Sequence, residues 1–477
     1  MNFIEDVLER FAASKPLLLT ISREDERRVW HAGELIAMSA GLSGAFAARG
    51  VDRGDVVMTL VGNRIEWALS LLACWRMGAV ALPCNAQLRR GDLAHRAAVA
   101  NPALCVGDAE LLGELPVGVP YMTLDDVAAA LDEDRPQETP ADVQALDPAD
   151  PALIAFTSGT TGEPRAALHA QSYLAGQRLQ AERWLGAGDG DLVWCTTATG
   201  WSKSARNVFL APWLRGAAAV LNDSPLDAGR RLELCEREGI TVLCQAPTEY
   251  RMLAARAELR PLPSLRRLVS AGEPLDPGAI DAWREGVGLE INDGYGQTET
   301  GHLTGAPIGS PVRPGSMGQP LPGIDLRISD GELEVRTASC PTFFSRYLDS
   351  APFEDEWWPT GDVVREDDDG YLWHEGRRDD LILSGGYRIG PHEVESALVA
   401  HPAVAEAAAV AAPDPERGAI VKAIVVARER PPSADLAREL QDHVKAITAP
   451  YKYPRIVEFA DSLPRTASGK LRRAELR

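Results

Sequence analysis

Short apolar runs alternate with stretches of helical character over much of the chain. Residues 56–61 are typical of a strand, 66–77 of a helix, and 79–82 of a second strand. The same order of strand, helix and strand returns at 217–221, 230–238 and 241–245. Two strands joined through a helix run parallel in one sheet, with the helix packed against it. The pattern therefore predicts an α/β body.

A change of pattern near residue 379 predicts a domain boundary. The charged run 376–380 is followed by an apolar strand, a Ser-Gly-Gly turn and a helix that begins near Pro391. Proline and acidic residues in a first turn favour a helix start. Further on, the sequence predicts strands at 403–411 and 421–427 and a helix at 433–447. Because 477 residues exceed one ordinary core, we expect a large domain of several subdomains over 1–378 and a small α+β domain over 379–477.

Composition narrows the class of protein. Hydrophobic residues make up 45% and charged residues 25% of the chain, which is an ordinary globular composition. No stretch resembles a membrane span, and the N-terminus is acidic where a secretory signal would be basic, so a cytoplasmic protein is expected. The formal charge of −20 opposes binding to nucleic acid or to a membrane. The seven scattered cysteines predict neither structural zinc nor a disulfide framework.

Residues 157–165 carry the clearest chemical signal. Hydroxyl side chains and glycines fill this run, which follows the apolar strand 152–156 and ends in a cation. Glycines let backbone N–H groups approach a phosphate, hydroxyls add donors, and arginine adds charge. The glycine spacing does not fit an ordinary P-loop, and on its own the run would also suit a flexible surface loop. The residues of this predicted polyphosphate cradle are Thr157, Ser158, Gly159, Thr160, Thr161, Gly162 and Arg165.

The cradle resembles the nucleotide loop of the adenylate-forming superfamily, which comprises acyl-CoA synthetases, peptide-synthetase adenylation domains and firefly-type luciferases. Further motifs resemble this family and follow its order along most of the chain. They are 270–275 (Ser-Ala-Gly-Glu-Pro-Leu), 294–299 (Gly-Tyr-Gly-Gln-Thr-Glu), 360–362 (Thr-Gly-Asp), 376–380 (Gly-Arg-Arg-Asp-Asp) and 464–470 (Pro-Arg-Thr-Ala-Ser-Gly-Lys). The resemblance implies an adenylation domain followed by a small C-terminal domain that moves about a hinge, here Asp379.

The resemblance also implies roles for single residues. Lys470 would bridge the acid and the α-phosphate of ATP, and Glu299 would bind Mg²⁺. Asp362 would accept the ribose hydroxyls with the help of Arg377. Arg165 departs from the family, in which lysine is usual at this position, so its detailed role is open. The remaining nucleotide contacts that the resemblance implies, with Tyr295 stacked on adenine, are Gly272, Glu273, Pro274, Asp293, Gly294, Tyr295, Gly296, Gln297 and Thr298.

A second group of residues resembles the segments that bind the acid substrate and the thiol of CoA in this family. The run 384–390 resembles the loop that lines the pantetheine tunnel of acyl-CoA synthetases. Its CoA-binding candidates are Ser384, Gly385, Gly386, Tyr387 and Arg388. The run 199–204 (Thr-Gly-Trp-Ser-Lys-Ser) is similar to a segment of medium-chain acyl-CoA synthetases, with Trp201 and Gly296 in the acyl pocket; a core tryptophan is the other interpretation of Trp201.

The expected function is therefore a carboxylate-CoA ligase that uses ATP, Mg²⁺ and coenzyme A on a medium-chain, branched or aromatic acid. Two alternatives stay open. The chain could load its acyl group onto the phosphopantetheine of an acyl carrier protein, or it could be a noncatalytic nucleotide-binding scaffold. The family resemblance further implies a homodimer.

Overall fold

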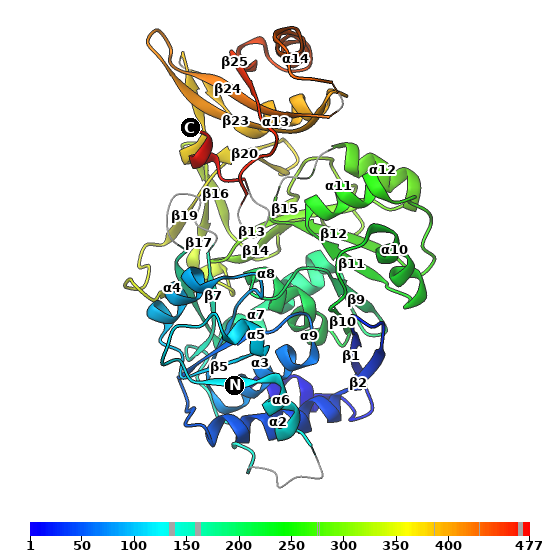
Figure 1. Cartoon of the computed structure of the whole chain (residues 1–477), viewed down its shortest axis with the longest axis vertical. Helices are drawn as coiled ribbons and strands as arrows, with labels where there is room; N and C mark the ends of the chain where they lie inside the picture. Colours follow the sequence, from blue (N-terminus) through cyan, green and yellow to red (C-terminus); the bar gives the residue numbers. More distant parts are fainter. Residues whose placement is uncertain are drawn as a thin grey trace.

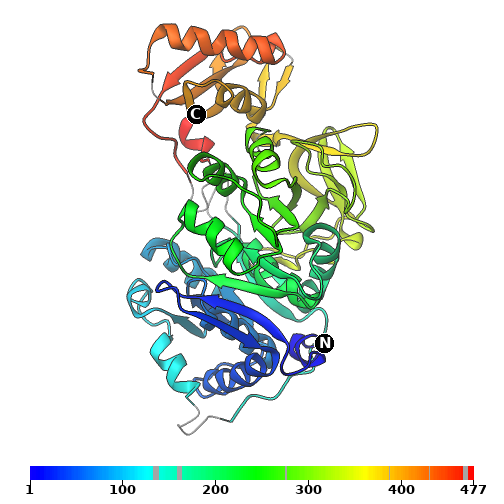
Figure 2. The same ribbon diagram turned by 90° about the vertical axis from the view of Figure 1, so that its right-hand side faces the viewer.

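The computed structural model describes residues 1–132, 139–157, 164–273, 275, 277–385, 387–428, 430–465 and 471–477. A large α/β body makes up most of the molecule, and a small α+β unit built by the last part of the chain lies at one end of it (Figures 1 and 2). The α/β class and the division into a large and a small part are as the sequence predicts.

One sheet of the described chain has seven strands and contains the first predicted βαβ unit. Strand β3 (Val56–Leu60) leads through α3 (Ile65–Met77) into β4 (Val80–Pro83), and the two strands pair in parallel. The strand before the predicted cradle is β7 (Pro151–Phe156), which adjoins β4. The sheet order is β18-β8-β7-β4-β3-β5-β6. Its other strands are β18 (Arg346–Tyr347), β8 (Ala166–Ala170), β5 (Leu104–Gly107) and β6 (Tyr121–Thr123).

A nine-stranded sheet of the described chain holds the second predicted unit. It contains β10 (Ala218–Asn222), α10 (Ala228–Arg237) and β11 (Val242–Gln245), with β9 (Leu192–Cys195) between the two strands and parallel to both. The order is β15-β14-β13-β12-β11-β9-β10-β1-β2. The remaining strands are β15 (Gln319–Pro320), β14 (Gly301–Gly305), β13 (Ile291–Gln297), β12 (Arg267–Ala271), β1 (Pro16–Ile21) and β2 (Arg27–His31).

Strands of both large sheets share one buried core. Trp67 and Trp75 on α3 pack against Phe209, with ring centroids 5.1 and 6.3 Å apart, and Phe209 packs on Trp213 at 4.7 Å. These fully buried rings remove a large apolar area from water. Phe209 and Trp213 fix the π-helical segment Arg206–Leu210 and helix α9 (Ala211–Leu214) in this core. The start of that segment borders the site described below.

Two smaller sheets follow. The first is antiparallel, with β16 (Leu326–Ser329), β17 (Glu332–Arg336), β19 (Trp357–Glu366) and β20 (Leu372–Arg377) in that order. The second lies in the small C-terminal unit and is built from β22 (Tyr387–Ile389), β21 (Ile382–Ser384), β24 (Gly418–Ala427), β23 (Val404–Asp414) and β25 (Ile456–Phe459). Helices α13 (Pro391–Val399) and α14 (Ala434–Ile447) pack on this sheet around a separate core. The strands and helices that the sequence predicts for the small unit are all present.

The other helices of the described chain lie in the large body. They are α1 (Phe3–Asp6), α2 (Ala32–Ala47), α4 (Arg90–Ala100), α5 (Ala109–Leu112), α6 (Leu124–Ala130), α7 (Gln171–Gln180), α8 (Ser202–Ala205), α11 (Pro247–Arg256) and α12 (Pro277–Val287). Among the described residues, no helix combines the length and the apolar character that crossing a membrane requires.

Candidate active site

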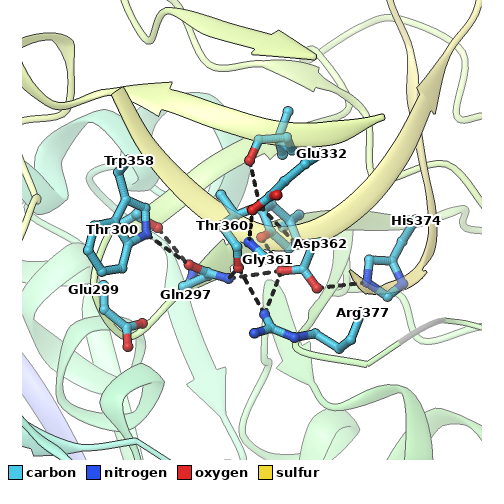
Figure 3. Close-up of polar contacts among 12 residues, drawn as sticks. Gln297, Glu299, Thr300, Glu332, Trp358, Thr360, Gly361, Asp362, His374 and Arg377 are labelled. Carbon is cyan, nitrogen blue, oxygen red and sulfur yellow. Dashed lines mark hydrogen bonds and ion pairs between the residues drawn. The ribbon is translucent and has the colours of Figure 1, made fainter. Parts of the chain in front are cut away.

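Asp362 is a buried carboxylate on β19, and side chains from two other strands converge on it (Figure 3). From β13, the Tyr295 hydroxyl donates to Oδ2 at 2.5 Å and Gln297 Nε2 donates to the same oxygen at 2.8 Å. From β20, Arg377 Nη1 donates to Oδ2 at 3.2 Å, and His374 Nε2 lies 3.0 Å from Oδ1. Burial opposes the charged form of Asp362, but the hydrogen bond and charge of His374 and the charge of Arg377 outweigh it and lower the pKa of the carboxyl. At neutral pH the group is an anion that accepts hydroxyl donors.

A β-bulge brings two residues of β20 to the same carboxylate. Asp362 pairs with Arg377, whereas Val364 pairs with His374, so the register shifts by one residue in between. Residues three apart on a regular strand point to opposite faces. The extra residue of the bulge restores a common face for His374 and Arg377. The arginine that the sequence predicts beside Asp362 is therefore joined by an unpredicted histidine.

The glycine before Asp362 is required by its surroundings. Gly361 has a φ of 72°, and a Cβ placed on it would lie 2.7 Å from Arg377 Nη2. Its N–H donates to Glu332 Oε1 at 2.8 Å, while Arg378 forms an ion pair with the other oxygen of Glu332. The turn that presents Asp362 is thus fixed by its own hydrogen bonds, and a larger residue at 361 would displace Arg377.

Glu299, the predicted magnesium ligand, is held by an aromatic hydroxyl. Tyr347 donates to Glu299 Oε1 at 2.6 Å, and burial together with the charge of Glu299 raises the pKa of Tyr347. The guanidinium of Arg165 stacks on the Tyr347 ring at 3.7 Å and pairs with Asp349 at 2.8 Å. This connects the end of the predicted cradle to the predicted metal ligand.

The described residues contain no group of three or more metal-binding side chains. A single carboxylate such as Glu299 nevertheless fits Mg²⁺, because this ion keeps several waters and is commonly held by one or two carboxylates and the phosphates of its nucleotide. The donor set at Glu299 is therefore compatible with a magnesium nucleotide, although not with a metal site built by protein alone.

The two described ends of the predicted cradle pair with each other. Thr157 N donates to the Arg165 carbonyl at 2.8 Å, and Arg165 N donates to the Thr157 hydroxyl at 3.1 Å. Since β7 and β8 on either side are antiparallel neighbours, residues 157–165 connect the two strands of a hairpin. The cradle residues Ser158, Gly159, Thr160, Thr161 and Gly162 lie outside the described residues.

Strand β13 carries the run that contains Tyr295. Gly296 leaves no room for a side chain, since a Cβ there would lie 1.9 Å from the Gly301 carbonyl oxygen on β14. Asp293 is buried, and burial raises its pKa well above the usual value. Gly294 is packed against His302 and Thr304. Of the predicted nucleotide residues on this strand, Asp293 and Gly294 are therefore buried, whereas 295–297 are partly accessible.

Neighbouring loops place further predicted residues beside β13. Lys203 Nζ donates to the Ala271 carbonyl at 3.2 Å and lies next to Gly272. Glu273 accepts a hydrogen bond of 2.6 Å from Thr248, and Pro274 lies outside the described residues. The Thr298 hydroxyl donates to Ser202 at 3.1 Å, one residue after Trp201.

Trp201 is only half buried and does not belong to the hydrophobic cores. It precedes α8 directly, and its carbonyl accepts the Ser204 N–H at 2.9 Å. The interpretation as a core tryptophan is therefore wrong, and a place in the wall of an acyl pocket stays a prediction.

The predicted CoA loop forms the β21–β22 hairpin of the small unit. Ser384 is buried, and Gly385 N donates to the Arg417 carbonyl at 3.0 Å. Tyr387 is exposed and stacks on Tyr451, with ring centroids 4.2 Å apart and an interplanar angle of 14°. Gly386, the side chain of Arg388 and Lys470 lie outside the described residues.

The predicted hinge residue Asp379 is exposed in a 3₁₀ turn, Arg378–Asp380. Arg477 donates to the Asp379 carbonyl at 2.9 Å and forms an ion pair with Asp380 at 2.5 Å. The hinge turn is therefore bound to a residue near the other end of the small unit's sequence.

Sequence reasoning gave no role to His374, Tyr347 or Lys203. His374 lies in a Trp-His-Glu run before the predicted arginine, and Tyr347 lies between motifs without a pattern of its own. The strand pattern argues against a role for His374 beside Arg377, because residues three apart on a regular strand point to opposite faces and the bulge has no signal in the sequence. Tyr347 had no signal either, because its contact with Glu299 joins residues 48 positions apart.

Comparison with known proteins places this site in a family. Residues 8–339 match the model of the AMP-binding enzyme family, and residues 393–470 match that of the AMP-binding enzyme C-terminal domain. The chain belongs to the AMP-binding enzyme family. This AMP-binding enzyme is 38% identical to the uncharacterized acyl-CoA ligase YtcI of Bacillus subtilis, over 98% of its own length and 94% of YtcI. It is 36% identical to the mitochondrial acyl-coenzyme A synthetase ACSM4 of Rattus norvegicus, over its whole length and 90% of that protein.

Solved structures agree with this placement. The AMP-binding enzyme resembles the anthranilate CoA ligase AuaEII in complex with anthranoyl-AMP, with a TM-score of 0.87, 29% identity and full coverage of this chain against 96% of the other. A benzoate CoA ligase from Burkholderia xenovorans LB400 gives a TM-score of 0.88 with 25% identity and full coverage of both chains. The predicted membership of the adenylate-forming superfamily and the predicted fold class are confirmed.

Proposed function

We propose that this AMP-binding enzyme is an ATP-dependent carboxylate-CoA ligase. In the first half-reaction a carboxylate oxygen attacks the α-phosphorus of ATP, and pyrophosphate leaves. In the second, the CoA sulfur attacks the acyl carbon, AMP leaves with the bonding pair, and the thiol proton is released. The observation that carries the proposal is the ionised Asp362, presented with Tyr295, Gln297 and Arg377 close to a site for a phosphate-bound cation at Glu299.

The chain's own residues would bind and orient the reactants. Asp362 would accept the ribose hydroxyls, and Arg377 would hold that carboxylate in its charged form. Lys470 would place its ammonium between the acid and the α-phosphate, where negative charge develops. Mg²⁺, held by Glu299 and the nucleotide phosphates, would supply neutralising charge when bound.

We place the hinge at Asp379, between a domain of residues 1–378 and one of residues 379–477. The exposed 3₁₀ turn there and the separate core of the small unit support this division. Rotation about Asp379 would bring the loop 384–388 to the adenylate, where its glycines would let the narrow pantetheine arm pass.

The acid is proposed to be medium-chain, branched or aromatic. Support comes from the resemblance to an ACSM4 synthetase and to benzoate and anthranilate ligases. A cytoplasmic location and a homodimer are part of the same proposal. A noncatalytic scaffold is disfavoured because Glu299, Asp362 and Arg377 are all present and held by hydrogen bonds. Arg377 donates to Asp362, and Glu299 accepts a hydrogen bond from Tyr347.

The test is AMP release from ATP with a panel of short, medium-chain, branched and aromatic acids, each with and without free CoA. Formation of both AMP and thioester that depends on CoA supports the proposal. Adenylate formation without turnover of CoA would point to a carrier-protein acceptor. Absence of AMP and of adenylate with every acid would contradict the proposed enzyme.

A further inference from the structure

Buried polar side chains gather behind β13, on elements that the nucleotide site does not use. This group, called the Arg206 cluster, consists of Arg206, His169 on β8, Tyr173 on α7, His302 on β14 and Trp184. Arg206 is 4% and His302 3% exposed, and the other three are fully buried. His169 and Tyr173 lie with ring centroids 4.1 Å apart, and Trp184 and His302 at 3.9 Å.

The cluster has unused hydrogen-bonding capacity. Both ring nitrogens of His169 and of His302, Trp184 Nε1 and Arg206 Nε make no hydrogen bond of ordinary geometry to the described part of the chain, and the Tyr173 hydroxyl has only weak interactions there with Arg206 and Gln177. Buried polar atoms are nearly always paired in folded proteins, because each unpaired one costs on the order of 1–3 kcal/mol. A concentration of them at one place offers hydrogen bonds to a bound polar ligand or to buried water.

Arg206 also lacks a counter-charge. Within the described ranges it interacts with the Tyr173 hydroxyl and donates a weak hydrogen bond from Nη1 to the Gln297 carbonyl at 3.5 Å, but no carboxylate there forms an ion pair with it. Burial, reinforced by the charge of Arg206, lowers the pKa of both His169 and His302, so the histidines are neutral and the arginine is the one cation of the cluster. A buried charge without a partner is costly, and adding an anion removes that cost.

The cluster borders the proposed acyl pocket. His302 is the direct strand partner of Gly296, and Arg206 follows the short helix α8 that begins after Trp201. Gln297 turns its side chain to Asp362 and its carbonyl to Arg206. Gln297 thus separates Asp362 on one side of β13 from the Arg206 cluster on the other.

We propose that the Arg206 cluster binds a second carboxylate at the far end of the acid substrate, so that the preferred substrates are dicarboxylic acids. This inference rests on the proposed ligase function. A carboxylate has about four acceptor positions and takes bidentate hydrogen bonds from a guanidinium. The indole, phenol and guanidinium are donors, and each neutral imidazole carries one N–H that can face such an anion.

The test compares matched acids on the full-length enzyme, for instance hexanoate with hexanedioate and benzoate with benzene-1,3-dicarboxylate. CoA-dependent AMP formation gives kcat and KM for each. At least one diacid should exceed its monoacid in kcat/KM by about tenfold or more. If monoacids turn over and no diacid is preferred, the inference is wrong. If no acid is activated, the proposed ligase function fails, and the substrate class with it.

Variants distinguish a specific loss of diacid binding from general damage to the fold. Arg206→Met should raise KM for the diacid by about tenfold with little change in kcat, and should leave the monoacid unchanged or improved. Arg206→Lys should retain part of the preference. Arg183→Met, an exposed arginine beside Trp184, is the matched control and should change nothing. If Arg206→Met does not fold, the wild-type comparison of paired acids still decides; equal diacid preference in wild type and a folded Arg206→Met protein would overturn the assignment.

Discussion

The hydroxyl of Tyr347 donates a hydrogen bond of 2.6 Å to the carboxylate of Glu299, and the guanidinium of Arg165 stacks over the face of the same ring. One aromatic residue thus touches both a residue proposed to bind the metal nucleotide and the last residue of the phosphate cradle. Stacking on Tyr347 and an ion pair with Asp349 therefore hold the Arg165 side chain in place. A lysine at this position could form the ion pair but could not stack as a planar guanidinium does.

Removing the Tyr347 hydroxyl should weaken the use of ATP. In Tyr347→Phe the aromatic stack with Arg165 remains, but Glu299 loses the donor that orients it. A hydrogen bond to a charged group contributes about 1.5–3 kcal/mol, so we expect kcat/KM for ATP to fall about tenfold, mostly through KM. Steady-state kinetics with varied MgATP measures this. Tyr371→Phe, which removes a hydroxyl bonded to the Pro311 carbonyl, should leave the ATP kinetics unchanged; equal losses in both variants would show a general packing effect.

The lowered pKa of Asp362 predicts a pH-dependent contribution to stability. The charged form is favoured by folding, so its contribution is fully present above the unfolded pKa of about 3.9 and is lost as pH falls through the lower folded pKa. Asp362→Asn should therefore be less stable than wild type at pH 7, and the difference should shrink below about pH 4. Urea unfolding at several pH values tests this. Asp368→Asn, at an exposed position of the β19–β20 turn, should show no such pattern.

Lys470 should serve the first half-reaction only. Lys470→Ala is expected to reduce the rate of adenylation about a hundredfold or more, because the ammonium stabilises the negative charge that develops at the α-phosphate. Thioester formation from supplied acyl-adenylate should be nearly unchanged. Exchange of pyrophosphate into ATP and release of acyl-CoA measure the two steps separately. Lys445→Ala, on the surface of the same unit, is the control, and a similar loss of both steps would refute the assignment.

Asp379→Pro should separate the half-reactions in the opposite way. Proline fixes φ at about −65°, which is a typical value for a 3₁₀ turn such as Arg378–Asp380, and prevents the large backbone change that a hinge needs. Adenylation should persist, whereas overall acyl-CoA formation should fall by at least about tenfold. Asp379→Ala, which keeps backbone freedom, should retain turnover. Full turnover by the proline variant would contradict a hinge at this position.

The sequence predicted most of the fold because the relevant patterns are local. The apolar run 56–61 and the helix at 66–77 were found within a residue or two of β3 and α3. The insertion of β9 between β10 and β11 could not be predicted, since strand order depends on packing across the sheet and not on neighbouring residues.

The contact between Asp362 and Arg377 was predictable, because each residue lies in a motif of its own. His374 reaches Asp362 only because a bulge changes the side to which it points, and nothing in the run of residues announces that bulge. The Arg206 cluster was missed for a related reason. Its members come from separate strands and helices, and each alone looks like an ordinary polar residue at the edge of an apolar stretch.

The four donors around Asp362 have a consequence for nucleotide recognition. An ionised carboxylate has about four lone-pair positions, and here Tyr295, Gln297, Arg377 and His374 all direct hydrogens or ring nitrogens at it. Three of these groups share Oδ2, whereas only His374 Nε2 faces Oδ1, so a ribose would meet one oxygen that is fully occupied and one with an acceptor position still open. A hydroxyl could bond to Oδ1 at no cost to the protein's own hydrogen bonds. A hydroxyl that bonds to Oδ2 would have to displace a protein donor, and its contribution to affinity would be the small difference between the bond formed and the bond given up.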